Sequence, residues 1–351
     1  MLLPEDDYPV HQTPQPLAHA MGGHPNAYDR FWFNGYREDL FFAVALGLYP
    51  NRGVIDAAFS VVVNGVQHSV FASDALLGRP TQVGPVRIEI IEPMRTNRIV
   101  IEAPEQGLAA DITYHAVTAT IEEPRQTMLD GARIFMDVTR ATQLGNWHGW
   151  IETPDGHFDV SDMGGTKDRS WGIRPVGEPL PGAPSIRVPQ LAFTWAPLLT
   201  NEGGVHVMSF DDADGRHLHH SAGRLPRSGD AQHVNGELIV EWGAGTRWLQ
   251  RATAIVDGSH YELEPVARFH MRGAGYSHPV YAHGKWHGGP LVAGETLTLA
   301  DLDPLEYHNI HVQHVVRVTG ASTGWGVVEQ LIIGPYEPAG TVGLLDGSRE
   351  K

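Results

Sequence analysis

Glycine and proline interrupt this chain often enough to limit its fold class. The 351 residues include 40 glycines and 25 prolines, about half again the average usage. Hydrophobic residues still make up 42% of the sequence, which is too many for a disordered chain. The turns must therefore connect short, well-packed elements, and this combination favours a mostly β protein.

The strongest local signal is a hairpin at Asn64-Gly65. Two β-branched runs within Phe59–Phe71 flank this dipeptide, which supplies the positive φ angles of a type I′ turn. Other segments alternate apolar and polar residues, as half-buried antiparallel strands do. They are Arg87–Glu92, Arg98–Ala103, Asp111–Glu122, Trp147–Thr153, His157–Val160, Gln190–Ser209, Glu237–Trp242, Trp248–Val256, Tyr261–Met271, Tyr307–Thr319 and Trp325–Ile333. Helices are expected only at Arg37–Ala45, after a cap at Asn34, and at Gln126–Met136.

A proline-rich segment separates two β-rich halves. Residues 176–189 cannot hold a regular ladder or helix for long. We therefore expect an N-terminal extension at 1–23, a first β unit at 24–175, this linker, a second β unit at 190–336 and a C-terminal tail at 337–351.

Charge and missing motifs exclude several functions. The 25 basic and 41 acidic residues give a net charge of −16, which disfavours nucleic acid and anionic membranes as partners. Cysteine is absent, which removes disulfides and thiolate chemistry. The sequence has no P-loop, GxGxxG or GxSxG motif, so no cofactor is expected. No signal-like start or long apolar run occurs, so we expect a cytoplasmic chain without stable membrane insertion, with a homodimer left open.

The first candidate for chemistry is Asp168, within Gly164–Arg174. Trp171 follows three residues later, and an indole packed on a carboxyl group would raise its pKa by desolvation and make it a proton donor near neutrality. The alternative is that Asp168 pairs with Arg169 or Arg174 and only closes a loop.

The second candidate is a glycine-rich segment dense in imidazole and aromatic groups. Imidazoles and phenols can relay protons, and aromatic faces can stabilise a cation. The alternative is a turn with surface histidines. The side chains concerned are Tyr276, His278, Tyr281, His283, Lys285, Trp286 and His287.

Three further positions are candidates with competing interpretations. Glu329 lies in an apolar run and needs a partner if buried, most simply an arginine. Tyr36 precedes an apolar run that also fits a helix start. His308 and His314 would share one face of a strand and His311 the other, so a three-histidine metal site is geometrically poor and no metal ligand is predicted.

The segment Asp168-Arg169-Ser170-Trp171-Gly172 resembles the Asp-His-x-Trp-Gly signature of the AttH-like and carotenoid hydratase (hydroxyneurosporene synthase-like) family. The resemblance spans roughly residues 24–336, and bacterial relatives carry a YxHPxxxHGxWHG-like stretch, here Tyr276 to Gly288. It implies two consecutive antiparallel lipocalin-like (calycin) β-barrels. Arg169 departs from the signature histidine, and arginine does not shuttle protons at pH 7.

The family resemblance implies cofactor-independent chemistry on hydrophobic, isoprenoid-like or aromatic molecules, by hydration, isomerisation or cyclisation. Asp168 is then the acid, and Tyr276, His278 and His283 complete the catalytic set. Substrate contacts are expected from Trp171, Trp286, His287, Tyr281, Tyr36 and Glu329. Two alternatives stay open: a non-catalytic carrier of a hydrophobic ligand, and a lyase or hydrolase that uses a histidine-bound metal.

Overall fold

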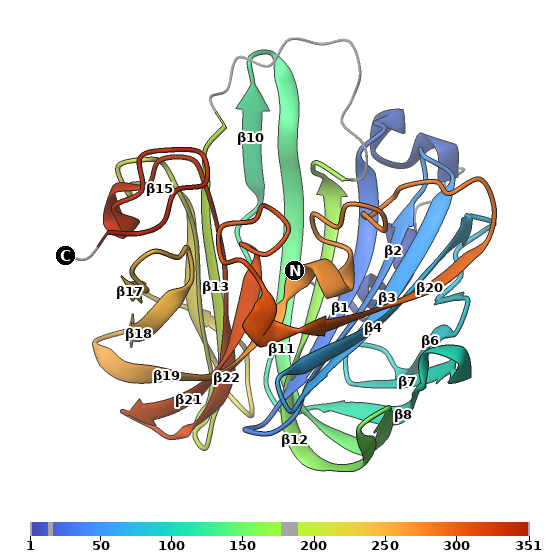
Figure 1. Cartoon of the computed structure of the whole chain (residues 1–351), viewed down its shortest axis with the longest axis horizontal. Coiled ribbons are helices and arrows are strands. Elements are labelled where there is room, and N and C mark those ends of the chain that lie inside the picture. The colour runs from blue at the N-terminus through green and yellow to red at the C-terminus, as the bar shows by residue number, and fades with distance from the viewer. Residues whose placement is uncertain (1, 13–16, 177–188, 350–351) are drawn as a thin grey trace.

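Two antiparallel sheets lie side by side in the computed structural model (Figure 1). The structure describes residues 2–12, 17–176 and 189–349. Within these ranges the first sheet has 13 strands and the second has 9. The architecture is therefore mostly β, as predicted.

The first sheet holds the N-terminal half of the chain and one later strand. Its members are β1 (Ala27–Tyr36), β2 (Phe41–Tyr49), β3 (Val54–Val63), β4 (Val66–Ala75), β5 (Gln82–Val83), β6 (Val86–Glu92), β7 (Thr96–Ala103), β8 (Leu108–Ala116), β9 (Ile121–Glu122), β10 (Gln126–Asp130), β11 (Arg133–Thr153), β12 (Gly156–Ile173) and β20 (Leu291–Thr298). The order is β20-β4-β3-β2-β1-β12-β11-β8-β7-β6-β5, and β9 and β10 pair with β11.

The second sheet runs in the order β16-β15-β14-β13-β22-β21-β19-β18-β17. Its members are β13 (Leu191–Thr200), β14 (Gly203–Asp211), β15 (His217–Leu225), β16 (Gln232–His233), β17 (Gly236–Trp242), β18 (Leu249–Val256), β19 (Ser259–His270), β21 (Val312–Gly320) and β22 (Gly324–Ile333). Short 3-10 turns complete the described elements: η1 (Pro4–Asp7), η2 (Pro9–Gln12), η3 (Leu17–Gly23), η4 (Pro104–Gln106), η5 (Met271–Ala274), η6 (Leu299–Asp301) and η7 (Glu337–Ala339). None of the described helices is long and apolar enough to cross a membrane.

The predicted hairpin is confirmed and both predicted helices are wrong. Asn64 and Gly65 take φ angles of 52° and 75° between β3 and β4, as a type I′ turn requires. The expected helix at 37–45 is largely strand β2, and the one at 126–136 is β10 and the start of β11. Strand β2 is buried along its whole length, so its continuous apolar run carries no period that separates strand from helix.

One strand of the C-terminal half completes the first sheet. Strand β20 pairs along its length with β4 and forms an edge of that sheet (Figure 1). Residues 177–188 of the predicted linker lie outside the described residues, and the proposed domain boundaries stay a prediction.

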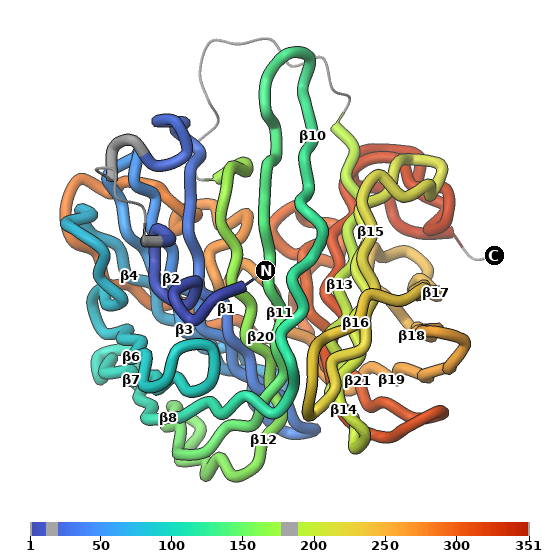
Figure 2. The backbone as a smooth tube through the Cα atoms, turned by 180° about the vertical axis from the view of Figure 1, so that it is seen from behind, coloured from blue at the N-terminus to red at the C-terminus, as the bar shows by residue number. Residues whose placement is uncertain are grey.

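The strand pair β1–β12 separates two buried layers. Phe31 and Phe33 point into the core of the first sheet, whereas Trp32 and Tyr36 point toward the second sheet. Figure 2 shows β11 and β13 running beside each other where the two sheets meet. We call the region between the sheets the inter-sheet layer. Its buried members include Tyr28, Trp32, Tyr36, Phe41, Tyr49, Val138, Trp195, Met208, Phe210, Phe269, Val315 and Val327.

Candidate functional site

Asp168 lies on the side of β12 that faces the inter-sheet layer. The sheet register places it opposite Trp32 of β1 and Thr142 of β11. Its Oδ1 atom is buried and has no hydrogen-bond partner. A buried acceptor without a donor is a feature that folded proteins usually avoid, so this carboxyl group needs an explanation.

The environment of Asp168 favours its protonated form. Burial raises its pKa to about 7; the charges of Glu123 and Glu329 add to the shift, and those of Arg140 and Arg174 oppose it. Among the described residues Asp168 forms no ion pair with an arginine, so the predicted loop-closing pair is not formed. The carboxyl group can therefore hold a proton at neutral pH, which is what a general acid requires.

Trp171 is not the aromatic neighbour of Asp168. Side chains alternate along a strand, so residues three apart point to opposite faces. The indole of Trp171 lies against His11, with ring centroids 3.7 Å apart, on the face where Arg169 pairs with Asp29 at 2.9 Å. The expected packing of Trp171 on Asp168 is therefore corrected: strand β1 supplies the aromatic neighbour instead.

Tyr276 is the aromatic centre of the candidate site. Its ring lies edge-on to Trp32 with a centroid distance of 6.3 Å, to His283 at 4.3 Å and to His311 at 5.0 Å. Tyr276 follows η5 and Trp32 adjoins Asp168 across the β1–β12 register. The structure thus brings two of the predicted catalytic residues, Tyr276 and His283, to the layer that Asp168 faces.

His283 is held as a neutral imidazole. Burial lowers its pKa well below the ordinary value, and the positive charges of Arg30 and Arg174 lower it further. Its Nε2 atom is buried without a hydrogen-bond partner. A neutral imidazole with a free nitrogen can hold a polar group of a ligand or a water molecule.

Glu329 has partners other than the arginine that was predicted. It accepts hydrogen bonds from His311 Nε2 at 2.7 Å and from Gln313 Nε2 at 2.6 Å. Because the Nε2 atom of His311 donates to the carboxylate, its Nδ1 atom is the one left to accept a proton. This carboxylate–imidazole pair is the arrangement that orients a general base.

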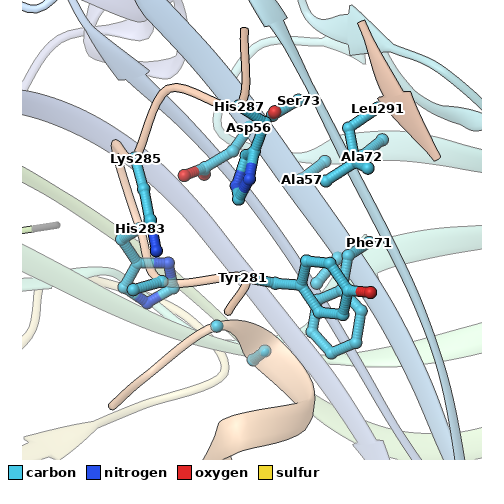
Figure 3. Close-up of a pocket in the computed structure, with 14 residues that line it drawn as sticks. Asp56, Ala57, Phe71, Ala72, Ser73, Tyr281, His283, Lys285, His287 and Leu291 are labelled. Carbon is cyan, nitrogen blue, oxygen red and sulfur yellow. The ribbon is translucent and has the colours of Figure 1, made fainter. Parts of the chain in front are cut away.

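A small pocket lies beside this cluster (Figure 3). Its volume is about 20 Å³, which is room for a water-sized molecule. The segment after Tyr276 covers it over β3 and β4. Its lining includes Asp56, Phe71, Ser73, Ala274, Tyr281, His283, Lys285, His287 and Leu291.

Asp56 is the acidic group of this pocket. Burial raises its pKa to about 6, and its carboxylate accepts hydrogen bonds from the Gly284 backbone at 2.6 Å and from the Tyr49 hydroxyl at 3.2 Å. Tyr281 stacks on Phe71 with ring centroids 4.8 Å apart and forms one wall.

Three predicted site residues lie away from Asp168. His278 Nδ1 accepts from the backbone N–H groups of Val280 and Tyr281 at 3.0 and 2.8 Å, and its Nε2 is 3.4 Å from Glu295, so its ring organises the loop. The indole of Trp286 is at the surface, 48% exposed, and forms no wall of the layer. Tyr36 shares the Trp32 face of β1 but lies four residues further along, where burial raises its phenol pKa.

Sequence reasoning missed Trp32, Arg30, Arg174, His311 and Asp56. Arg30 stands in the aromatic run AYDRFWFNGY of β1, and Asp56 in the apolar run of β3. A charged residue in such a run was the available signal, because it must be partnered or functional when buried. Within the described ranges, no three His, Asp or Glu side chains are grouped so that they could hold a metal ion.

Solved structures with a similar fold define the structural class. An AttH candidate from Nitrosomonas europaea gives a TM-score of 0.56 at 11% sequence identity, over 91% of this chain and 97% of that protein. Kievitone hydratase from Nectria haematococca gives 0.50 at 12% identity, over 86% of this chain and 88% of that protein. The predicted resemblance in fold to AttH-like proteins is confirmed: the chain is a mostly β protein with a double lipocalin-like fold.

The chain belongs to a family of unknown function, DUF8625, whose model matches residues 2–342. A search of curated proteins gave no match.

Proposed function

We propose that the protein is a cofactor-independent lyase of the hydratase type, which adds water to a carbon–carbon double bond of a hydrophobic, isoprenoid-like or aromatic molecule, or removes it. The observation that carries this proposal is the carboxyl group of Asp168, whose Oδ1 atom is buried without a hydrogen-bond partner and whose pKa burial raises to about 7. The shared fold with a kievitone hydratase is consistent with it.

Asp168 is the proposed acid. In the hydration direction its proton forms a bond to one alkene carbon, and the π electrons that make this bond leave a cation on the other carbon. The ring of Trp32 stabilises that cation through its negative face. Tyr276, whose ring carries the guanidinium groups of Arg30 and Arg174, positions Trp32 by an edge-on contact. A dry aromatic layer also keeps bulk water from competing for the proton.

His311 is the proposed base. Its Nδ1 atom takes a proton from the water molecule while the water oxygen bonds to the cation, and the Glu329 carboxylate stabilises the imidazolium that results. His283 holds the water through its free nitrogen. Return of the proton from His311 to Asp168 restores the protein, so the product is the substrate plus one water.

The test begins with the natural ligand. Extraction of freshly purified protein followed by mass spectrometry identifies the bound molecule, and isotope-labelled water reports hydration by incorporation of its oxygen. We expect Asp168→Asn to lose at least about 100-fold in turnover, the typical contribution of a general acid. Asp162→Asn is the matched control, because Asp162 lies on the same strand with its side chain 74% exposed.

Full turnover by Asp168→Asn would overturn the proposal. A ligand that the wild-type protein returns unchanged, and that still binds when Asp168 and His283 are both replaced, would assign the protein to the carriers instead.

A further inference from the structure

Two buried arginines, Arg169 and Arg247, stabilise the fold, and the protein supplies hydrogen-bond acceptors for their guanidinium groups. Arg169 pairs with Asp29 at 2.9 Å and donates to three backbone carbonyl groups. Arg247 pairs with Asp346 at 2.9 Å and donates to four backbone carbonyl groups. Every side-chain nitrogen of both residues therefore has an acceptor.

Arg30 and Arg174 differ from these two arginines, because some of their side-chain nitrogens have no hydrogen-bond acceptor. Arg30 is 1% exposed, and only its Nη2 atom donates, to the Ala274 carbonyl at 3.1 Å, while Nε and Nη1 are buried without an acceptor. Arg174 has a buried Nε without an acceptor, and its Nη2 lies 3.5 Å from the Tyr276 hydroxyl. Neither forms an ion pair within the part of the chain that the structure describes.

The two guanidinium groups lie in one part of the inter-sheet layer. Their carbon atoms are 4.6 and 5.3 Å from the centroid of the Tyr276 ring. Both charges also act on Asp56 and on His283. Both guanidinium groups therefore lie over the ring of Tyr276, the aromatic centre of the candidate site.

Among the described residues no carboxylate lies within ion-pair distance of either guanidinium group. Asp56, whose pKa burial raises to about 6, is mostly ionised at neutral pH and offsets part of the two charges from a greater distance. Burial raises the pKa of Asp168 to about 7, so it is ionised only in part. Burial also holds His283 neutral. A buried cation without a partner is unfavourable, so this arrangement is explained best by a ligand that supplies the missing negative charge.

We infer that Arg30 and Arg174 bind an anionic oxygen of the substrate, a carboxylate or a phenolate or enolate, carried on an apolar skeleton that lies against Trp32 and Tyr276. The planar guanidinium fork suits such an oxygen, because it offers parallel N–H donors. An anion held near Asp168 also favours the protonated carboxyl group. That the bound anion is a substrate rests on the proposed function. The preference for an anion can be measured by binding alone.

Binding of three naphthalene probes to the full chain, followed by tryptophan fluorescence, tests the inference. Naphthoate carries the carboxylate, naphthamide is its neutral analogue, and naphthol reports a bound phenolate by its red-shifted absorption. We expect naphthoate, or naphthol as its phenolate, to bind at least about tenfold more tightly than naphthamide, as a charge-assisted hydrogen bond supplies. Tight binding of naphthoate assigns a carboxylate, and tight binding of naphthol assigns a phenolate or enolate.

The variants locate the anion site. Arg30→Gln and Arg174→Gln should each weaken binding of the anion about tenfold and leave naphthamide unchanged. Arg30→Lys should keep part of the preference, since it retains the charge. Arg317→Gln is the control for net charge, because Arg317 is 39% exposed and pairs with Glu38 and Glu264 at the surface.

Equal affinities of the wild-type protein for all three probes, or no binding of either anion at millimolar concentration, would overturn the inference. So would an equal loss of naphthoate and naphthamide in the glutamine variants. The Asp168→Asn variant tells the two proposals apart: it should lower turnover at least about 100-fold and still bind naphthoate or naphthol more tightly than naphthamide.

Discussion

The two faces of strand β12 carry charged residues with opposite degrees of pairing. On one face, Lys167 lies 2.5 Å from Asp7 and 2.9 Å from Asn97, and Arg169 has an acceptor for each nitrogen. On the other face, Asp168 has a buried oxygen without a donor. Charges that build this fold are paired within the protein, so the unpaired charges of the second face indicate where a ligand binds.

The largest expected effect tests the paired face. Arg169→Met should lower the free energy of unfolding by about 3–5 kcal/mol, because Asp29 would stay buried without its guanidinium partner. Arg30→Met removes one hydrogen bond together with an unpaired charge, so it should change stability by about 1 kcal/mol or less. Urea unfolding of both variants measures the difference.

A similar loss in the two variants would contradict the comparison, since it would mean that Arg30 supports the fold as Arg169 does.

The second prediction concerns the pH dependence of the unpaired face. Because the pKa of Asp168 is raised to about 7 in the folded state, the folded protein binds more protons than the unfolded chain between about pH 4 and pH 7. Stability therefore falls as pH rises through that window, and Asp168→Asn removes this contribution. Between about pH 5 and about pH 8, the free energy of unfolding of the variant should rise by about 2.5 kcal/mol relative to that of the wild type.

Asp56 contributes a slope of the same sign to both proteins and cancels in the difference. Parallel pH profiles for wild type and Asp168→Asn would show that Asp168 is ionised as usual. Turnover should likewise fall as pH rises through about 7, because the acid loses its proton.

The third prediction sharpens the link between Glu329 and Asp168. Glu329→Gln should cost about 1–3 kcal/mol of stability, because the His311 ring loses a charged acceptor. It should also lower the pKa of Asp168, since the Glu329 charge is one of the causes of its rise. The free energy of unfolding of this variant, measured as a function of pH, reports both effects. A profile parallel to that of the wild type would show that the charge of Glu329 does not raise the pKa of Asp168.

The smallest effect is expected outside both faces. Trp286 is at the surface, so Trp286→Ala should change the free energy of unfolding by less than about 0.5 kcal/mol and leave ligand affinity unchanged. Urea unfolding and fluorescence titration check this. A large loss of ligand affinity in this variant would show that Trp286 does contribute to ligand binding.

Local patterns predicted much of the fold. The Asn64-Gly65 turn follows from the positive φ angles that these two residues can adopt. The alternating strands follow from the burial of only one of their two faces. Strand β2 was mistaken for a helix because it is buried throughout, and a continuous apolar run does not distinguish the two. The crossing of β20 to the edge of β4 depends on long-range pairing that no local pattern encodes.

The candidate site was predictable only in part. Asp168, Tyr276 and His283 could be selected because polar groups stand beside aromatic residues in the sequence. Trp171 was wrongly predicted to contact Asp168 because the two residues are close in the sequence. On a strand, residues three apart point to opposite faces. Trp32 and Arg30 reach the site through the β1–β12 register, and the His311–Glu329 pair through β21 and β22, so only the fold identifies them.

The most direct test of the account is the ionisation of Asp168 itself. Infrared difference spectra between wild type and Asp168→Asn, recorded across a pH titration, isolate the carbonyl band of a protonated carboxyl group. The account predicts a band that disappears with a midpoint near 7. A band that is already lost by about pH 5, as for an ordinary aspartate, would contradict it.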